Sequence, residues 1–231
     1  HRDLHSFPTR RSSDLGTVNN GNFRSDWQSE TAQFYSNSQN DVVDEPSFYF
    51  QESSYESSPL NRVTEVFGPG SAWRQVNNEK PVSYQYRPND LNDQIPHFKV
   101  TSSHQIVYVN DYAAGQLWVN EVTDEDGHST LEWVNGLQQV ICRKAEVDDG
   151  VFYTTYYVYD QYGLLSMVKP PQAAIEAVAD WGFFLNDYSF RRKWLYLYRH
   201  DHRQRLIEKQ IPGSDPISYI YIGYWIGRAH V

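Results

Sequence analysis

Two short stretches of the sequence carry residue types that could bind a metal ion. His200, Asp201 and His202 form a triplet of imidazole and carboxylate groups, which are common zinc ligands. Residues 124–127, Asp-Glu-Asp-Gly, resemble the start of a calcium loop, but the twelfth position from Asp124 is Asn135 where glutamate is needed. We therefore interpret both stretches as solvated turns and expect no metal site and no cofactor.

Other reactive side chains have equally plain structural interpretations. Glu176 and Asp180 are four residues apart and would share the solvated face of a helix. Cys142 lies in the apolar stretch QQVICRK without a Cys/His motif, which favours a buried thiol over a nucleophile. The stretch from residue 16 to residue 225 has no GxSxG, P-loop, HExxH or strand-linked GxGxxG motif. We expect no enzyme, although paired carboxylates of a glycosidase would meet in space and not in sequence.

The two ends of the chain resemble translated sequencing adapter. Residues 1–15 read HRDLHSFPTRRSSDL and residues 226–231 read IGRAHV. Segments of that origin are set aside in fold reasoning, as tags and fusion scars are. The sequence therefore divides into four parts: an adapter-like segment 1–15, a polar acidic and partly irregular segment 16–60, a β region 61–225, and an adapter-like segment 226–231.

Composition and charge favour a sheet protein that does not bind nucleic acid. Tyrosine, phenylalanine and tryptophan make up 16% of the 231 residues, and aromatic side chains suit pleated, half-buried surfaces. The formal charge is −9, and setting aside four arginines and two aspartates in the adapter-like ends gives −11. Phosphate binding needs an excess of lysine and arginine, so nucleic acid is an unsuitable partner. With no run of about 18 apolar residues, this segment is not expected to insert into a membrane.

Short apolar runs alternate with turn signals from residue 61 onward. Examples are QIVYVN, QLWVNEV, STLEW, QQVICRK and FYTTYYVY, and this pattern predicts an antiparallel all-β array. One helix is expected near residues 172–181, because Pro170 and Pro171 suit a helix start and Gly182 is placed to end it. Its apolar stripe of Ala174, Val178 and Trp181 would cover a sheet face.

An internal repeat is the most informative feature of the sequence. An Asp or Asn is followed three residues later by Gly or Gln in four places: Asp124 and Gly127, Asn135 and Gln138, Asp160 and Gly163, Asp201 and Gln204. An Asp or Asn side chain can accept bonds from the next backbone amides, and the later position tolerates positive φ. Each unit is then one β-hairpin, with strand aromatics that need a stacked neighbour: Trp133, Tyr157, Tyr159 and Tyr198.

These repeats resemble the YD repeat of the RHS and teneurin-like families. The stretch YVYDQYG with LLSMV is similar to the Tyr-Asp-Gly-Arg signature, and YRHDHRQRLIEKQIPG resembles a second copy. The stretches SPLNRVTEVFGPGSAW and YAAGQLWVNEVTDEDG resemble the region upstream of the RHS core, so the resemblance covers residues 34–213. The arginine of the signature is Leu164 in the best copy, and two of the four copies lack the glycine.

The resemblance implies a structural role in a secreted or cell-surface protein. In this family a long β-strip winds into a hollow shell, often around a C-terminal toxin or effector made on the same chain. The expected partners are therefore the remainder of the polypeptide shell and such an effector. The alternative is a β module whose exposed aromatic side chains bind a carbohydrate or a partner protein.

Overall fold

A computed structural model describes residues 29, 32, 33, 50–70, 73, 81–176, 181–222 and 225–228. The adapter-like residues 1–15, most of the polar segment 16–60, and residues 177–180 of the expected helix lie outside the described residues. The backbone of the described residues 225–228 is strand β14, so part of the C-terminal adapter-like segment pairs with the sheet.

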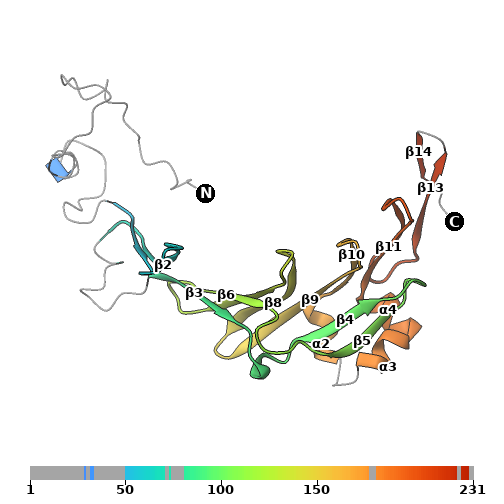
Figure 1. Cartoon of the computed structure of the whole chain (residues 1–231), viewed down its shortest axis with the longest axis horizontal. Coiled ribbons are helices and arrows are strands. Elements are labelled where there is room, and N and C mark those ends of the chain that lie inside the picture. Colours follow the sequence, from blue (N-terminus) through green and yellow to red (C-terminus); the bar gives the residue numbers. More distant parts are fainter. Residues whose placement is uncertain are drawn as a thin grey trace.

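Twelve strands of the described residues form one antiparallel sheet in the order β1-β2-β3-β6-β7-β8-β9-β10-β11-β12-β13-β14. Figure 1 shows this sheet as a long curved strip along which the strands follow one another. The expectation of consecutive antiparallel hairpins is confirmed. The strand bounds are β1 Glu52–Tyr55, β2 Val63–Phe67, β3 Val82–Pro88, β6 Trp118–Thr123, β7 Ser129–Val134, β8 Val140–Asp148, β9 Val151–Tyr159, β10 Leu165–Lys169, β11 Tyr196–His200, β12 Leu206–Gln210, β13 Ile217–Ile222 and β14 Trp225–Arg228.

One hairpin leaves the strip. Strands β4 (Pro96–Val100) and β5 (Ile106–Asp111) form a separate two-stranded sheet, and β3 pairs with β6 across the insertion. The buried Asn89 holds the base of this hairpin, because its Oδ1 accepts from the Leu117 amide at 2.8 Å and its Nδ2 donates to the Ala113 carbonyl at 3.0 Å. A buried amide with its partners in place fixes the chain at this crossing.

The helical segment between β10 and β11 is larger than expected. The expected helix corresponds to α2 (Pro171–Glu176), and it is followed by α3 (Trp181–Asn186) and α4 (Tyr188–Trp194). The expectation that Gly182 ends a helix is wrong, since Gly182 lies inside α3. Asp187 begins α4, where its side chain accepts the amides of Ser189 and Phe190.

The insertions cover one face of the strip. In Figure 1 the β4–β5 hairpin and the helices lie together on the same side of the sheet. One core cluster joins Phe98 of β4 and Phe190 of α4 to Val158 and Met167 of the sheet. A second cluster, centred on Trp133 and Cys142, lies beside it under Ile95 and Tyr112. Burial of this apolar face is the main stabilising term for a sheet that exposes its other face.

Candidate functional site

The four repeat turns have the same hydrogen-bond pattern. In each, the amide of the first residue donates to the carbonyl four residues later, and the amide of the fourth residue donates back to the carbonyl of the first. The side-chain oxygen of the first residue accepts two further amides, as Asp160 does from Tyr162 and Leu164, both at 2.9 Å. Asp124, Asn135 and Asp201 accept in the same way at 2.8–3.1 Å.

The fourth residue of each turn lies in the left-handed region. The φ angle is 91° at Gly127, 79° at Gly163, and 62° at both Gln138 and Gln204. A three-residue hairpin loop places a left-handed residue here so that the chain can rejoin the ladder. Glycine adopts this conformation without strain, whereas the Cβ of glutamine makes it sterically unfavourable. The two Gln turns therefore carry backbone strain that the two Gly turns lack.

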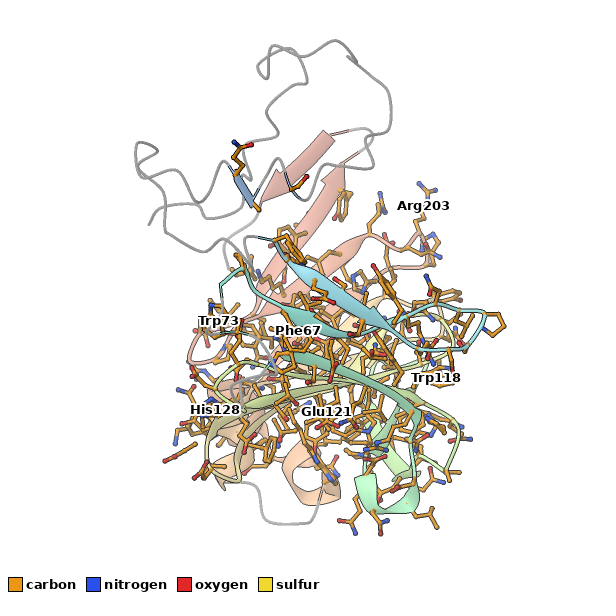
Figure 2. The ribbon with its side chains drawn as sticks, turned by 90° about the vertical axis from the view of Figure 1, so that its left-hand side faces the viewer. Phe67, Trp73, Trp118, Glu121, His128 and Arg203 are labelled. Carbon is orange, nitrogen blue, oxygen red and sulfur yellow. The ribbon has the colours of Figure 1, made fainter. Side chains whose placement is uncertain are left out.

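Three of the four turns lie on one edge of the strip. Because strand direction alternates, the turns at Asn135, Asp160 and Asp201 share an edge and the turn at Asp124 lies on the other. Figure 2 shows this separation through two labelled residues, His128 beside the first turn and Arg203 inside the last. The Asn135 and Asp160 turns are linked directly, since Gln139 Nε2 donates to the Gly163 carbonyl at 3.0 Å.

A fifth turn of the same kind closes the β4–β5 hairpin and was not found from the sequence. Thr101 takes the place of the aspartate, with its Oγ1 accepting the Gln105 amide at 3.1 Å, and His104 has a φ of 61°. His104 Nε2 also lies 2.9 Å from the His200 carbonyl beside the Asp201 turn. The tip of the inserted hairpin therefore reaches the same edge as the three repeat turns.

The four repeat aromatics occupy different environments. Trp133 is 1% exposed and lies in the second core cluster, where Lys144 Nζ stands 5.0 Å from its ring centroid. Tyr157, Tyr159 and Tyr198 are half-buried. Tyr159 packs against that cluster and donates to the Val140 carbonyl at 3.3 Å. Of the four repeat aromatics, Trp133 is therefore fully buried and the three tyrosines are partly exposed.

Tyr157 and Tyr159 help to line an open groove of about 420 Å³, here called the tyrosine groove. It lies between the inserted hairpin and the edge that carries the Asn135 and Asp160 turns. The rings, amides and charged groups that line it are His97, Phe98, Lys99, Tyr112, Asn135, Gln139, Tyr157, Tyr159, Asp160 and Gln161. Four of these were singled out in the sequence, and the fold brings them together. The other repeat residues do not line the groove: Asp124, Gly127, Trp133, Gln138, Gly163, Tyr198, Asp201 and Gln204.

The tyrosine groove combines flat rings and amide groups with two charged groups, Lys99 and Asp160. Burial raises the pKa of Tyr112, and burial followed by the nearby Tyr157 raises the pKa of Tyr159, so both phenols keep their protons. Tyr159 donates its proton to the Val140 carbonyl, which leaves Tyr112 as the phenol that can donate to a ligand. The His97 and Tyr112 rings lie 4.5 Å apart and tilted by 32°. Flat rings beside amide donors and acceptors suit the apolar face and hydroxyl groups of a sugar.

A buried lysine lies between the two core clusters. Lys169 is 3% exposed, and its Nζ stands 4.5 Å from the Trp181 ring centroid and 5.3 Å from that of Tyr156. Burial lowers the pKa of Lys169 to about 8. The neighbouring Cys142 is fully buried, and burial raises its pKa to about 12, which keeps the thiol protonated and unreactive.

The residues considered as metal ligands are engaged in turns. The Asp201 carboxylate accepts two amides and the Arg205 guanidinium, whose Nε lies 2.8 Å away, and this bond to Arg205 is the main reason that its pKa falls to about 2. The described residues contain no group of three or more His, Cys, Asp or Glu side chains placed to hold a metal ion. The side chains of Glu176 and Asp180 lie outside the described ones. No helix within the described ranges is long and apolar enough to cross a membrane.

Comparison with protein families gives a match to the N-terminal part of the chain. A family described as "Domain of unknown function (DUF6443)" matches residues 5–88, a stretch that begins inside the adapter-like segment and ends at the last residue of β3. It covers less than half of the chain and ends before the first repeat turn at Asp124. Comparison with curated proteins gives no match. The chain is therefore similar to this family over its N-terminal part, and the family's description names no function.

Proposed function

We propose that this chain is a structural segment of a larger protein of the RHS/YD-repeat kind. The observation that carries the proposal is the shared geometry of the four repeat turns, in which side-chain identity varies while the bonds and the left-handed fourth residue do not. A scaffold is selected for such hairpin geometry, because each hairpin needs its neighbours to bury its aromatic face.

The proposal extends to the rest of the polypeptide. The strip would continue beyond this segment into a secreted or surface shell, and a C-terminal toxin or effector of the same chain would lie inside it. The aromatic and apolar face covered by the insertions would then belong to the wall. In this role the segment performs no catalysis and needs no cofactor.

Recovery of the full reading frame from the source DNA, followed by hydrogen exchange on the full-length protein, tests the proposal. We expect further Tyr-Asp-Gly hairpins to follow. We also expect the amides of β13 to exchange more slowly in the full-length protein, where a complete repeat strand would take the place of the four-residue, partly adapter-like strand β14. β13 amides that exchange equally fast in both proteins, or a reading frame that leaves the hairpin pattern at once, would count against a continuous sheet.

A carbohydrate-binding role is the second candidate, and the tyrosine groove is the observation that favours it. Neutral oligosaccharides would give saturable amide shifts in two-dimensional NMR spectra of the full chain. These shifts should be lost with Tyr157→Ala and kept with Tyr153→Ala, because Tyr153 lies on the same strand but is 48% exposed outside the groove. If the amide shifts are the same in wild type and in both variants, the carbohydrate-binding role is contradicted.

A further inference from the structure

A second cavity lies where the inserted hairpin, helix α4 and the main sheet meet. This pocket, here called the arginine pocket, has a volume of about 270 Å³. The residues that matter for its chemistry are His104 at the hairpin tip, Arg191 on α4, and Ser166, Arg199 and Glu208 on the sheet. It shares only Val100 with the tyrosine groove, so the two cavities lie on different parts of the insertion.

Arg191 is the unusual member of this set. Its backbone carbonyl is fixed by Gln210, whose Nε2 donates to it at 3.2 Å, and by the amide of Leu195 at the helix end. Its side-chain Nε, in contrast, is buried and has no hydrogen-bond partner among the described residues. The adjacent Arg192 is paired with Asp215 at 2.8 Å. A buried guanidinium donor without an acceptor is costly, and a bound anion would remove that cost.

The charges around the pocket favour an anion. Arg199 and Glu208 face each other at 3.4 Å and offset one another, which leaves Arg191 as the uncompensated cation of the lining. The surrounding sequence, residues 188–210, has seven lysines and arginines against two acidic residues, in a chain whose overall charge is −9. This local positive field would attract an acidic ligand to an otherwise acidic protein.

We propose that the arginine pocket binds a carboxylate group, through a fork formed by Nε and a terminal nitrogen of Arg191. A planar guanidinium matches a carboxylate with two parallel hydrogen bonds. The volume of about 270 Å³ is small for a ligand pocket and suits one acidic side chain or a short dicarboxylic acid. The Ser166 hydroxyl, on a residue that is 5% exposed, and the His104 ring provide the polar wall around it.

The test follows the Arg191 Nε–H signal in NMR spectra of the full chain labelled with ¹⁵N-arginine. The probes are glutarate, the capped peptide Gly-Glu-Gly, and its neutral counterpart Gly-Gln-Gly. We expect a saturable shift of this one signal with an acidic probe and none with the neutral peptide. Tighter binding of the peptide than of glutarate identifies a polypeptide side chain as the ligand, and the reverse order identifies a free dicarboxylic acid.

Two variants separate a built site from general charge attraction. Followed through backbone amide shifts of the pocket residues, because the variant has no Arg191 Nε–H, Arg191→Gln should weaken binding at least about tenfold, since a hydrogen bond to a charged group is worth about 1.5–3 kcal/mol. Arg192→Gln removes an equal charge from the same helix and should leave the affinity unchanged. The proposal is overturned if the Arg191 signal does not saturate, if both variants lose binding equally, or if inorganic phosphate binds as tightly as the carboxylates.

Discussion

Replacing Lys169 with methionine should make the protein more stable at neutral pH. The ammonium of Lys169 is almost fully buried, and its only close partners in the described structure are the faces of the Trp181 and Tyr156 rings. Methionine has nearly the same length and volume and would keep the packing between the two core clusters. The substitution therefore removes a buried charge and leaves little empty space.

The magnitude follows from the pKa of Lys169, which burial lowers from 10.5 to about 8. Below pH 8 the folded and unfolded states both carry the charge, and the folded state bears the whole desolvation penalty. Between pH 8 and 10.5 the folded state loses its proton first, so stability rises with pH across this window. At about 1.4 kcal/mol per pKa unit the rise is about 3 kcal/mol.

The two ring contacts stabilise the ammonium by about 0.5–2 kcal/mol, which reduces the gain from the substitution. We expect Lys169→Met to raise the free energy of unfolding by about 1–3 kcal/mol at pH 7, and the difference from wild type to shrink towards pH 10. Cys142 acts in the opposite direction, because burial raises its pKa from 9.0 to about 12 and stability is lost above pH 9. This loss occurs in both proteins, but it cancels only in part in the difference, because the Lys169 ammonium itself lowers the pKa of Cys142.

Urea denaturation of both proteins at pH 7, 8, 9 and 10 measures the effect. Lys144→Met is the matched control, because Lys144 also stands over a tryptophan ring, at 5.0 Å, but is only half-buried. Its effect on stability should be small, since a half-buried ammonium keeps much of its hydration. A Lys169→Met protein that is less stable than wild type at pH 7, or a difference that stays constant from pH 7 to 10, would refute the reasoning.

Three further substitutions test the turns and the core by urea denaturation. Gly163→Ala should destabilise the protein more than Gly150→Ala. Both glycines have positive φ, but only the Cβ added at residue 163 would meet a side-chain atom, Gln139 Nε2 at 3.1 Å. Equal losses of stability would show that backbone strain alone decides the effect. Gln204→Gly should be neutral or stabilise by up to about 1 kcal/mol, since it relieves a left-handed glutamine, and a clear loss would contradict the turn alignment. Trp133→Ala should cost about 3–5 kcal/mol and Tyr157→Ala clearly less, because only the tryptophan is fully buried; similar losses would contradict this ranking.

Much of the sheet could be predicted because its determinants are local. The alternation of apolar residues places strands, and the spacing from Asp160 to Gly163 places a turn, within a few residues of chain. The turn at Thr101 was not predicted, because a threonine hydroxyl replaces the carboxylate there and a histidine replaces the glycine. Local rules of this kind recognise a turn by its commonest side chains, whereas the backbone needs only an acceptor and a tolerated φ.

The departure of the β4–β5 hairpin from the strip could not be predicted in the same way. Nothing in the alternation of residues 96–111 distinguishes a strand of the main sheet from one of a separate sheet. The pairing of β3 with β6 is fixed by Asn89, whose partners Ala113 and Leu117 lie 24 and 28 residues further along. Side-chain bonds across that separation depend on the folded arrangement, which single-sequence patterns do not encode.

Under the proposed functions, the two cavities would bind ligands while the repeat turns hold the sheet together. Both are lined by the inserted hairpin, the tyrosine groove by residues 96–100 and 112, and the arginine pocket by residues 100 and 103–106. The residue types of the repeat turns can vary because the hairpin requires only a side-chain hydrogen-bond acceptor and a residue in the left-handed region. Ligand binding requires particular groups at particular distances. The residues that would supply them, such as His97, Tyr112 and Arg191, lie in the segments that interrupt the repeat. In this arrangement the binding residues lie on insertions and the sheet is built from repeated hairpins. The residues of the insertions can therefore vary without loss of the sheet.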